Sequence, residues 1–173
     1  HDQSSAASDV YKRQMYKETY SIWLQNSIHN EKVYELIKRY AKEEDKDSFF
    51  PHVTLVSHID SEETALKILN KLLVKKSTVI FDRVSTGDTY FQKLYLESSD
   101  NSYFFNAVSK IEGWPSLWVP HMSLCYGDEL PKSFDLGELN ELIPITISFD
   151  TLSLYKTGPN ISEWKEITTL RLN

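Results

Sequence analysis

The sequence predicts one bilobal α+β domain with mixed or antiparallel sheets and helices on the outside. Segments with strand-like alternation follow segments with helical periodicity, yet neighbouring strands also occur, so the sheets are not purely parallel. The pattern Pro-His-x-(Thr or Ser)-Leu occurs twice, at 51–55 and 120–124, each time on a predicted strand that follows a predicted helix. This repetition indicates two pseudo-symmetric lobes, and no low-complexity linker separates them.

The predicted strands are short runs rich in β-branched and aromatic residues. They occupy residues 19–25, 52–57, 77–85, 89–97, 121–126, 144–149, 151–157 and 163–172. A turn at Gly87-Asp88 is expected to join the third and fourth strands as a hairpin. The sheet therefore contains at least one antiparallel pair.

The predicted helices show apolar residues at helical spacing. They occupy residues 30–44, 61–76, 101–113 and 133–142. Asn30 is the expected N-cap of the first helix. Leucines on one face support the second helix, and Gly113 is expected to close the third.

The composition is that of an ordinary soluble globular protein, with 40% hydrophobic and 25% charged residues. No apolar run approaches the roughly 18 residues that span a bilayer, so we expect no membrane association. The single cysteine excludes an intrachain disulfide framework and a thiolate zinc site, and it favours a reducing, cytoplasmic compartment. The net charge of −6 weighs against a long nucleic acid as the partner, but it is compatible with a small anionic substrate.

The first fourteen residues, HDQSSAASDVYKRQ, are polar, rich in small residues and without periodicity. We expect 1–14 to be a disordered extension or a sequence artefact, with a natural disordered arm as the alternative. Met15 opens a segment that resembles a protein start. The single bilobal domain is therefore expected to occupy 15–173.

The two repeated motifs contain the residues with catalytic potential. Side chains two apart on a strand share a face, so His52 lies beside Thr54, and His121 beside Ser123. A neutral imidazole and a protonated one are what concerted acid–base catalysis requires near neutral pH. Hydroxyls donate hydrogen bonds to phosphoryl oxygens. No carboxylate cluster lies at ligand spacing from these histidines, so we expect no metal.

A structural role for the motifs has to be weighed, because a lone histidine on a strand is more often structural than catalytic. Average residue usage predicts one such motif in on the order of a few per thousand chains of this length. Two copies in one chain therefore favour a functional pair over coincidence. The chemistry that fits this pair is metal-free cleavage of a phosphodiester.

The duplicated His-x-(Thr/Ser) signature resembles that of the 2H phosphoesterase superfamily. Within it, FFPHVTLVSHI and VPHMSLCYGD are most similar to the cyclic phosphodiesterases of fungi and plants, and YSIWLQ and STGDTYFQKLYLE add to the similarity. The resemblance implies an active site in a central cleft between the lobes. It also implies cofactor-free hydrolysis of a ribose cyclic phosphate, either a 2′,3′-cyclic nucleotide to a 2′-phosphate or ADP-ribose 1″,2″-cyclic phosphate to the 1″-phosphate.

Carried over to this chain, the resemblance makes His52 and His121 the acid–base pair, while Thr54 and Ser123 hold the phosphate. Which histidine acts as the base depends on which ester bond breaks. We assign His121 to the activation of water and His52 to the protonation of the leaving oxygen.

Four further residues are predicted to bind substrate. Trp23 and Tyr126 match positions that line the cleft of this family. Trp23 is expected either to stack on a base or to pack in the core. Tyr126 can hydrogen-bond the phosphate only if its strand bends before Gly127. Tyr90 and Gln92 are expected to share a face of a central strand and to form a cleft wall, with a structural role as the alternative.

Other functions stay open at this point. The same machinery can act on a cyclic dinucleotide or another nucleotide messenger. A non-catalytic nucleotide or RNA-end binder is a further alternative, although a binder does not need two proton-transfer groups. We expect a monomer with a small nucleotide cyclic phosphate as its partner, and we expect His58 to be an ordinary surface residue.

Overall fold

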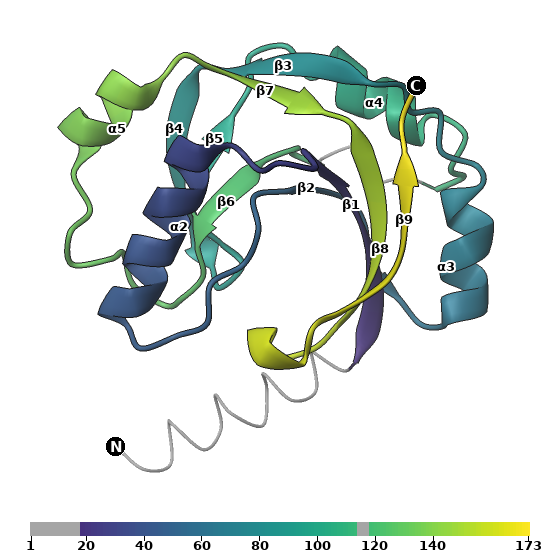
Figure 1. Ribbon diagram of the computed structural model, residues 1–173, viewed down its shortest axis with the longest axis horizontal. Coiled ribbons are helices and arrows are strands. Elements are labelled where there is room, and N and C mark those ends of the chain that lie inside the picture. The colour runs from purple at the N-terminus through teal and green to yellow at the C-terminus, as the bar shows by residue number, and fades with distance from the viewer. Residues whose placement is uncertain (1–17, 114–117) are drawn as a thin grey trace.

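The computed structural model describes residues 18–113 and 118–173, so the predicted extension at 1–14 lies outside the described residues. A curved seven-stranded antiparallel sheet dominates the structure (Figure 1). In spatial order its strands are β4 (Arg83–Thr89), β5 (Gln92–Glu97), β6 (Met122–Cys125), β2 (Val53–Ile59), β1 (Thr19–Gln25), β8 (Thr151–Thr157) and β9 (Lys165–Arg171). A second sheet pairs β3 (Ser77–Phe81) with β7 (Ile145–Phe149).

The two histidine motifs meet in the middle of the large sheet, because β2 contains the first motif and its neighbour β6 the second. A single residue pair, Val53 with Met122, joins these two strands. Among the described residues, this pair is the only ladder pairing between the β4-β5-β6 half and the β2-β1-β8-β9 half of the sheet. The two predicted lobes are therefore joined at the position where both histidines lie.

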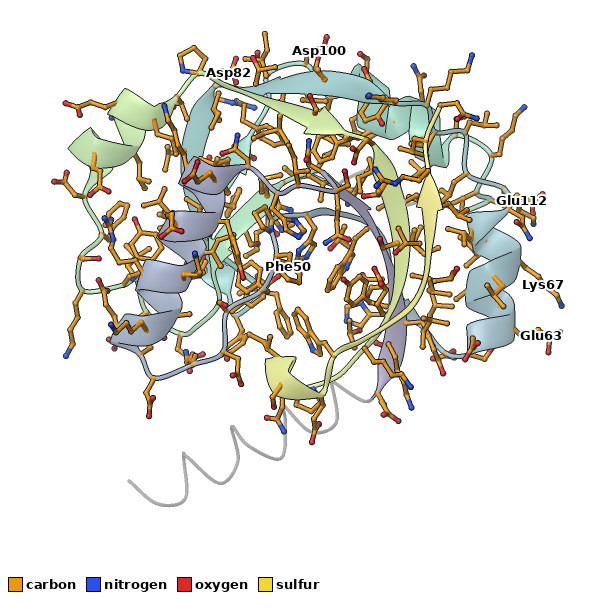
Figure 2. All side chains as sticks on the ribbon, in the orientation of Figure 1. Phe50, Glu63, Lys67, Asp82, Asp100 and Glu112 are labelled. Atoms are coloured by element: carbon orange, nitrogen blue, oxygen red, sulfur yellow. The ribbon has the colours of Figure 1, made fainter. Side chains whose placement is uncertain are left out.

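Short helices pack around the sheet and confirm the predicted α+β class (Figure 1). They are α2 (Glu31–Glu43), α3 (Glu62–Leu69), α4 (Ser102–Val108), α5 (Leu136–Leu142) and the 3-10 turn η1 (Ile161–Glu163). The Asn30 side chain accepts the Val33 amide, as expected of an N-cap. Glu63 and Lys67 project from the outer face of α3 (Figure 2), 2.9 Å apart. None of the described helices is long and apolar enough to cross a membrane.

The core lies on one face of the large sheet, where alternate strand residues are fully buried. Ile22 and Leu24 of β1, Leu55 of β2, and Met122 and Leu124 of β6 are all inaccessible to solvent. Burying a side chain of this size contributes about 1.5–3 kcal/mol. The intervening residues necessarily point to the opposite face of the same strands. The alternation that anchors the core therefore also directs the motif histidines toward the other face.

The predicted helices 61–76 and 101–113 are longer than the observed α3 and α4. After α3 the chain turns, and the Leu73 amide donates to the Ala107 carbonyl at 3.1 Å, which ties this segment to α4. Leu73 is 55% exposed. The prediction of one continuous leucine face was wrong because a tertiary hydrogen bond replaces the helical one.

The predicted strand 77–85 and its hairpin also differ from the structure. The strand divides into β3 and β4, which belong to different sheets. The turn from β4 to β5 lies at Tyr90 and Phe91 rather than at Gly87-Asp88. Gly87 lies in an irregular stretch of the ladder, where an added Cβ would be 2.3 Å from the Gln92 carbonyl oxygen. The glycine is therefore required by close backbone approach, and Tyr90 does not lie on a central strand.

Candidate active site

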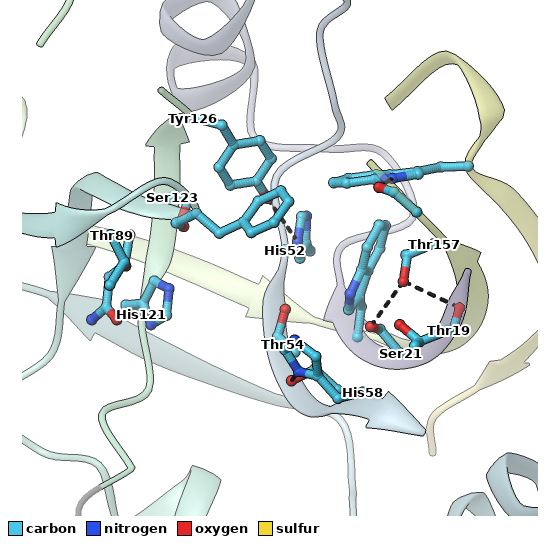
Figure 3. Close-up of a pocket in the computed structure, with 16 residues that line it drawn as sticks. Thr19, Ser21, His52, Thr54, His58, Thr89, His121, Ser123, Tyr126 and Thr157 are labelled. Carbon is cyan, nitrogen blue, oxygen red and sulfur yellow. Dashed lines mark hydrogen bonds between the residues drawn. The ribbon is translucent and has the colours of Figure 1, made fainter. Parts of the chain in front are cut away.

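A cavity of about 270 Å³ collects the residues of both motifs (Figure 3). His52, Thr54, His121 and Ser123 line it, together with Trp23, Gln92 and Tyr126. Tyr90 is not among the lining residues and instead packs edge-on against Phe91. In the part of the chain that is described, the lining contains no aspartate, glutamate, lysine or arginine. Apart from the Tyr126 phenol, the ionisable groups in the cavity are histidines, which carry either no charge or a positive one.

Both catalytic candidates are oriented in the same way by their own motif. The Nδ1 atom of His52 lies 2.7 Å from the Phe50 carbonyl oxygen, and that of His121 lies 2.9 Å from the Val119 carbonyl oxygen. A carbonyl only accepts, so Nδ1 bears the hydrogen in each ring. The neutral tautomer therefore leaves a lone pair on Nε2, and the protonated form has an N–H there. In both motifs the accepting residue immediately precedes the proline.

His52 is held in an apolar and aromatic environment. It is 5% exposed, and its ring stacks on Trp23 at a centroid distance of 3.8 Å. Burial lowers the pKa of His52 to about 4, the Phe50 carbonyl acts in the opposite direction, and the charge of His121 lowers it further. His52 is therefore neutral at pH 7.

His121 is only half-buried, and the ring of Tyr95 meets it edge-on at 5.1 Å. Burial lowers the pKa of His121, while the Val119 carbonyl and the negative charge of Glu97 both act to raise it. The protonated form is therefore supported by two groups around His121. For His52, the Phe50 carbonyl is the only group that acts to raise the pKa.

The two motif hydroxyls differ in their present hydrogen bonds. Ser123 Oγ donates to the Phe91 carbonyl oxygen at 2.9 Å, so the β4–β5 turn orients it. The Thr54 hydroxyl has no hydrogen-bond partner within the described residues. An antiparallel register through Val53 and Met122 places each histidine across from the hydroxyl of the other motif. Each hydroxyl is therefore near both imidazoles in the sheet, and not only near the one in its own motif.

One of the two predicted roles of Trp23 was to stack on a base of the substrate, and the structure does not allow this role. Its ring is 3% exposed and has His52 on one face and Tyr155, at 4.1 Å, on the other. A base could reach either face only by displacing one of these rings. The structure therefore corresponds to the alternative of core packing, and Trp23 supports His52 directly.

Tyr126 turns toward the cavity because β6 ends at Cys125. A bend of the strand before Gly127 was the condition under which Tyr126 was predicted to reach the phosphate. Its hydroxyl lies 3.4 Å from His52 Nε2, and its ring stacks on Phe49 at 4.1 Å. Burial raises the pKa of the Tyr126 phenol, which keeps this hydroxyl neutral and able to donate. The Tyr126 hydroxyl therefore faces the Nε2 lone pair of neutral His52.

Sequence patterns did not identify nine residues of the described lining, which are Thr19, Ser21, Ser57, His58, Thr89, Phe91, Thr157, Gly158 and Trp164. Phe91 lies in the β4–β5 turn, and Trp164 follows η1 with its indole N–H donating to the Gly158 carbonyl at 2.8 Å. Trp164 belongs to no recognisable motif, and Phe91 lies in the stretch STGDTYFQKLYLE, in which only Tyr90 and Gln92 were predicted to form a cleft wall. His58 is exposed, as expected, but it also lines the cavity. Its position depends on irregular pairing of β2, which no local sequence signal predicts.

Residues 19–113 match a family model described as cyclic phosphodiesterase-like protein. The chain belongs to this family. The match covers more than half of the sequence and includes the first histidine motif, and it ends before the second. The family lies within the 2H phosphoesterase superfamily that the paired motifs predicted, and the chain is a phosphodiesterase. The narrower similarity to the fungal and plant enzymes stays a prediction.

Solved structures share this fold at low sequence identity. Escherichia coli LigT in its apo form has a TM-score of 0.60 and 11% identity, over 91% of this chain and 99% of that chain. LigT complexed with 3′-AMP gives 0.60 and 11%, over 90% and 98%. A structure described as a phosphoesterase gives 0.59 and 12%, over 91% and 99%. These similarities establish the fold alone. No curated protein matches the sequence.

Proposed function

We propose that this phosphodiesterase hydrolyses a ribose cyclic phosphate, either a 2′,3′-cyclic nucleotide to the 2′-phosphate or ADP-ribose 1″,2″-cyclic phosphate to the 1″-phosphate. The observation that supports this most strongly is the pair of imidazoles in one cavity, each with Nδ1 bound to a carbonyl and Nε2 available for proton transfer. A cyclic phosphodiester is an anion. The absence of carboxylates from the described lining suits such a substrate.

In the proposed mechanism His52 is the general base and His121 the general acid. His52 Nε2 takes a proton from water as the water oxygen bonds to phosphorus, replacing the Tyr126 hydroxyl near this nitrogen. The bond from phosphorus to one ribose oxygen breaks, and His121 Nε2–H protonates that oxygen. The burial of His52 supports these roles, because a histidine with a pKa of about 4 is neutral before the reaction. This order reverses the roles assigned from sequence.

Thr54 and Ser123 complete the proposed mechanism by donating hydrogen bonds to the non-bridging phosphoryl oxygens. Ser123 exchanges its bond to the Phe91 carbonyl for one to phosphate. The proposal also includes a monomeric protein that acts on a small nucleotide without a metal. Among residues 18–113 and 118–173, no group of three or more His, Cys, Asp or Glu side chains is placed to hold a metal ion.

The test is turnover of adenosine 2′,3′-cyclic phosphate in EDTA, with products separated by chromatography. His52→Ala and His121→Ala should each lower kcat by about 10²- to 10⁴-fold, and the double variant should fall little further because the two groups act together. His29→Ala is the matched control, since His29 is a histidine outside the lining. Most of the activity surviving in either cavity variant would contradict the mechanism.

Two alternatives are resolved by the same preparation of the protein. A substrate panel that includes cyclic dinucleotides determines whether another nucleotide is cleaved faster. Calorimetry identifies a non-catalytic binder, which would bind the cyclic nucleotide tightly and release no product.

A further inference from the structure

The cavity extends beyond the histidine pair to a polar end that the proposed mechanism does not use. Ser21 of β1, Ser57 and His58 of β2, and Thr157 of β8 line this end. Figure 3 shows His58, Ser21 and Thr157 on the far side of Thr54 from His121. We call these four residues, Ser21, Ser57, His58 and Thr157, the distal polar end.

An irregular stretch of β2 brings Ser57 and His58 into the distal polar end. Opposite β1, Thr54 pairs with Trp23 and Val56 with Ile22, but the next pair is Ile59 with Tyr20. β2 therefore has one more residue than β1 in each of these two steps. Such bulges redirect side chains and are frequent beside active sites. In a regular strand two consecutive residues point to opposite faces, whereas here Ser57 and His58 both line the cavity.

His58 has a backbone conformation that residues other than glycine rarely adopt. Its φ is 57°, in the left-handed region that favours glycine. A histidine persists at such a position when its surroundings determine the conformation, and such positions cluster at ligand clamps. His58 combines this conformation with a place in the cavity lining, and the combination supports a binding role for its side chain.

The hydrogen bonds of the distal polar end leave donors for an anion. Ser57 Oγ and His58 Nδ1 are 2.9 Å apart. When the imidazole is protonated, Nδ1–H donates to Ser57, so that the Ser57 O–H and the His58 Nε2–H are both directed to a ligand. Thr157 Oγ1 donates to the Thr19 carbonyl and lies 3.3 Å from Ser21 Oγ. No carboxylate occurs in the described lining to compete for these donors.

We infer that the distal polar end binds a second phosphoryl group of the substrate, with His58 and Ser57 as the residues that recognise it. The inference rests on the proposed function and narrows its substrate class. The favoured substrate is a ribose cyclic phosphate that bears a further phosphoryl group outside the cyclic ester. The histidine pair holds the cyclic phosphate, and the distal polar end holds the other phosphoryl group in the same cavity.

The test compares adenosine 2′,3′-cyclic phosphate with the same compound bearing a 5′-phosphate. Charge-assisted hydrogen bonds from His58 and Ser57 should raise kcat/KM for the 5′-phosphorylated compound about tenfold. His58→Gly should bring the ratio of the two values close to one. Glycine suits the left-handed backbone, so this variant is expected to fold. His29→Gly is the matched control, because His29 is a histidine with φ 48° outside the lining, and it should keep the ratio.

Two results would overturn the inference: equal kcat/KM for both compounds, or a ratio that survives His58→Gly, which includes an equal loss for both compounds in that variant. An equal loss would indicate a contact to the nucleoside. Turnover of neither compound would count against the proposed function instead. In that case calorimetry tests the inference. Adenosine 2′,5′-bisphosphate should bind about tenfold more tightly than adenosine 2′-phosphate, and this difference in affinity should vanish in His58→Gly.

Discussion

Because His52 is buried and neutral, the free energy of unfolding should fall as the pH is lowered. Replacing His52 alone should remove this part of the pH dependence. Its pKa is about 4 in the folded protein, against about 6.5 for an unperturbed histidine. Between these values the unfolded chain binds a proton that the folded protein does not, so stability falls as the pH falls below 6.5. By pH 5.0 this costs about 2 kcal/mol of unfolding free energy, and the full loss below pH 4 is about 3 kcal/mol.

Urea denaturation at pH 7.5 and at pH 5.0, followed by tryptophan fluorescence, measures this cost for the wild type and for His52→Gln. Other titrating groups contribute to both proteins, so the difference between their pH dependences isolates His52. The wild type should lose about 2 kcal/mol more than the variant on going to pH 5.0. An equal pH dependence of the two proteins would refute the reasoning and would remove the basis for assigning His52 as the general base.

The remaining predictions concern the acid, the phenol and the sheet. Above the lowered pKa of His121, kcat/KM should fall about tenfold per pH unit, and a flat pH profile would exclude this acid. Tyr126→Phe keeps the stack on Phe49, so thermal melting should change little, whereas the pH dependence of kcat/KM on the acid side should shift. Gly87→Ala adds a Cβ at 2.3 Å from a carbonyl oxygen and should cost about 1–3 kcal/mol in urea. An unchanged denaturation midpoint for Gly87→Ala would contradict the close approach of the β4 and β5 backbones at this position.

The part of the site that follows from strand alternation could be predicted from sequence. His52 with Thr54, and His121 with Ser123, line one cavity because period-two geometry needs only a correct strand assignment. The N-cap at Asn30 was equally predictable, because its signal is local. The repetition of the motif led us to expect that the two motifs lie close together. In the structure they do, because β2 and β6 are adjacent strands of the large sheet.

The features that the sequence did not reveal depend on tertiary contacts. Trp23 has the residue type of a base-stacking platform, but only the folded chain shows His52 and Tyr155 on its two faces. His58 reaches the cavity through irregular pairing with β1, which alternation cannot predict. The proposed assignment of acid and base also differs from the one made from sequence, because the burial that lowers the pKa of His52 cannot be read from its motif, which is nearly identical to that of His121.

The most direct test of the central claim is a crystal structure with adenosine 2′-phosphate, the proposed product. The account predicts one phosphate within about 2.6–3.2 Å of the Nε2 atoms of both His52 and His121, with the hydroxyls of Thr54 and Ser123 on its oxygens. A phosphate that contacts only one of the histidines, or that binds outside the cavity, would contradict it.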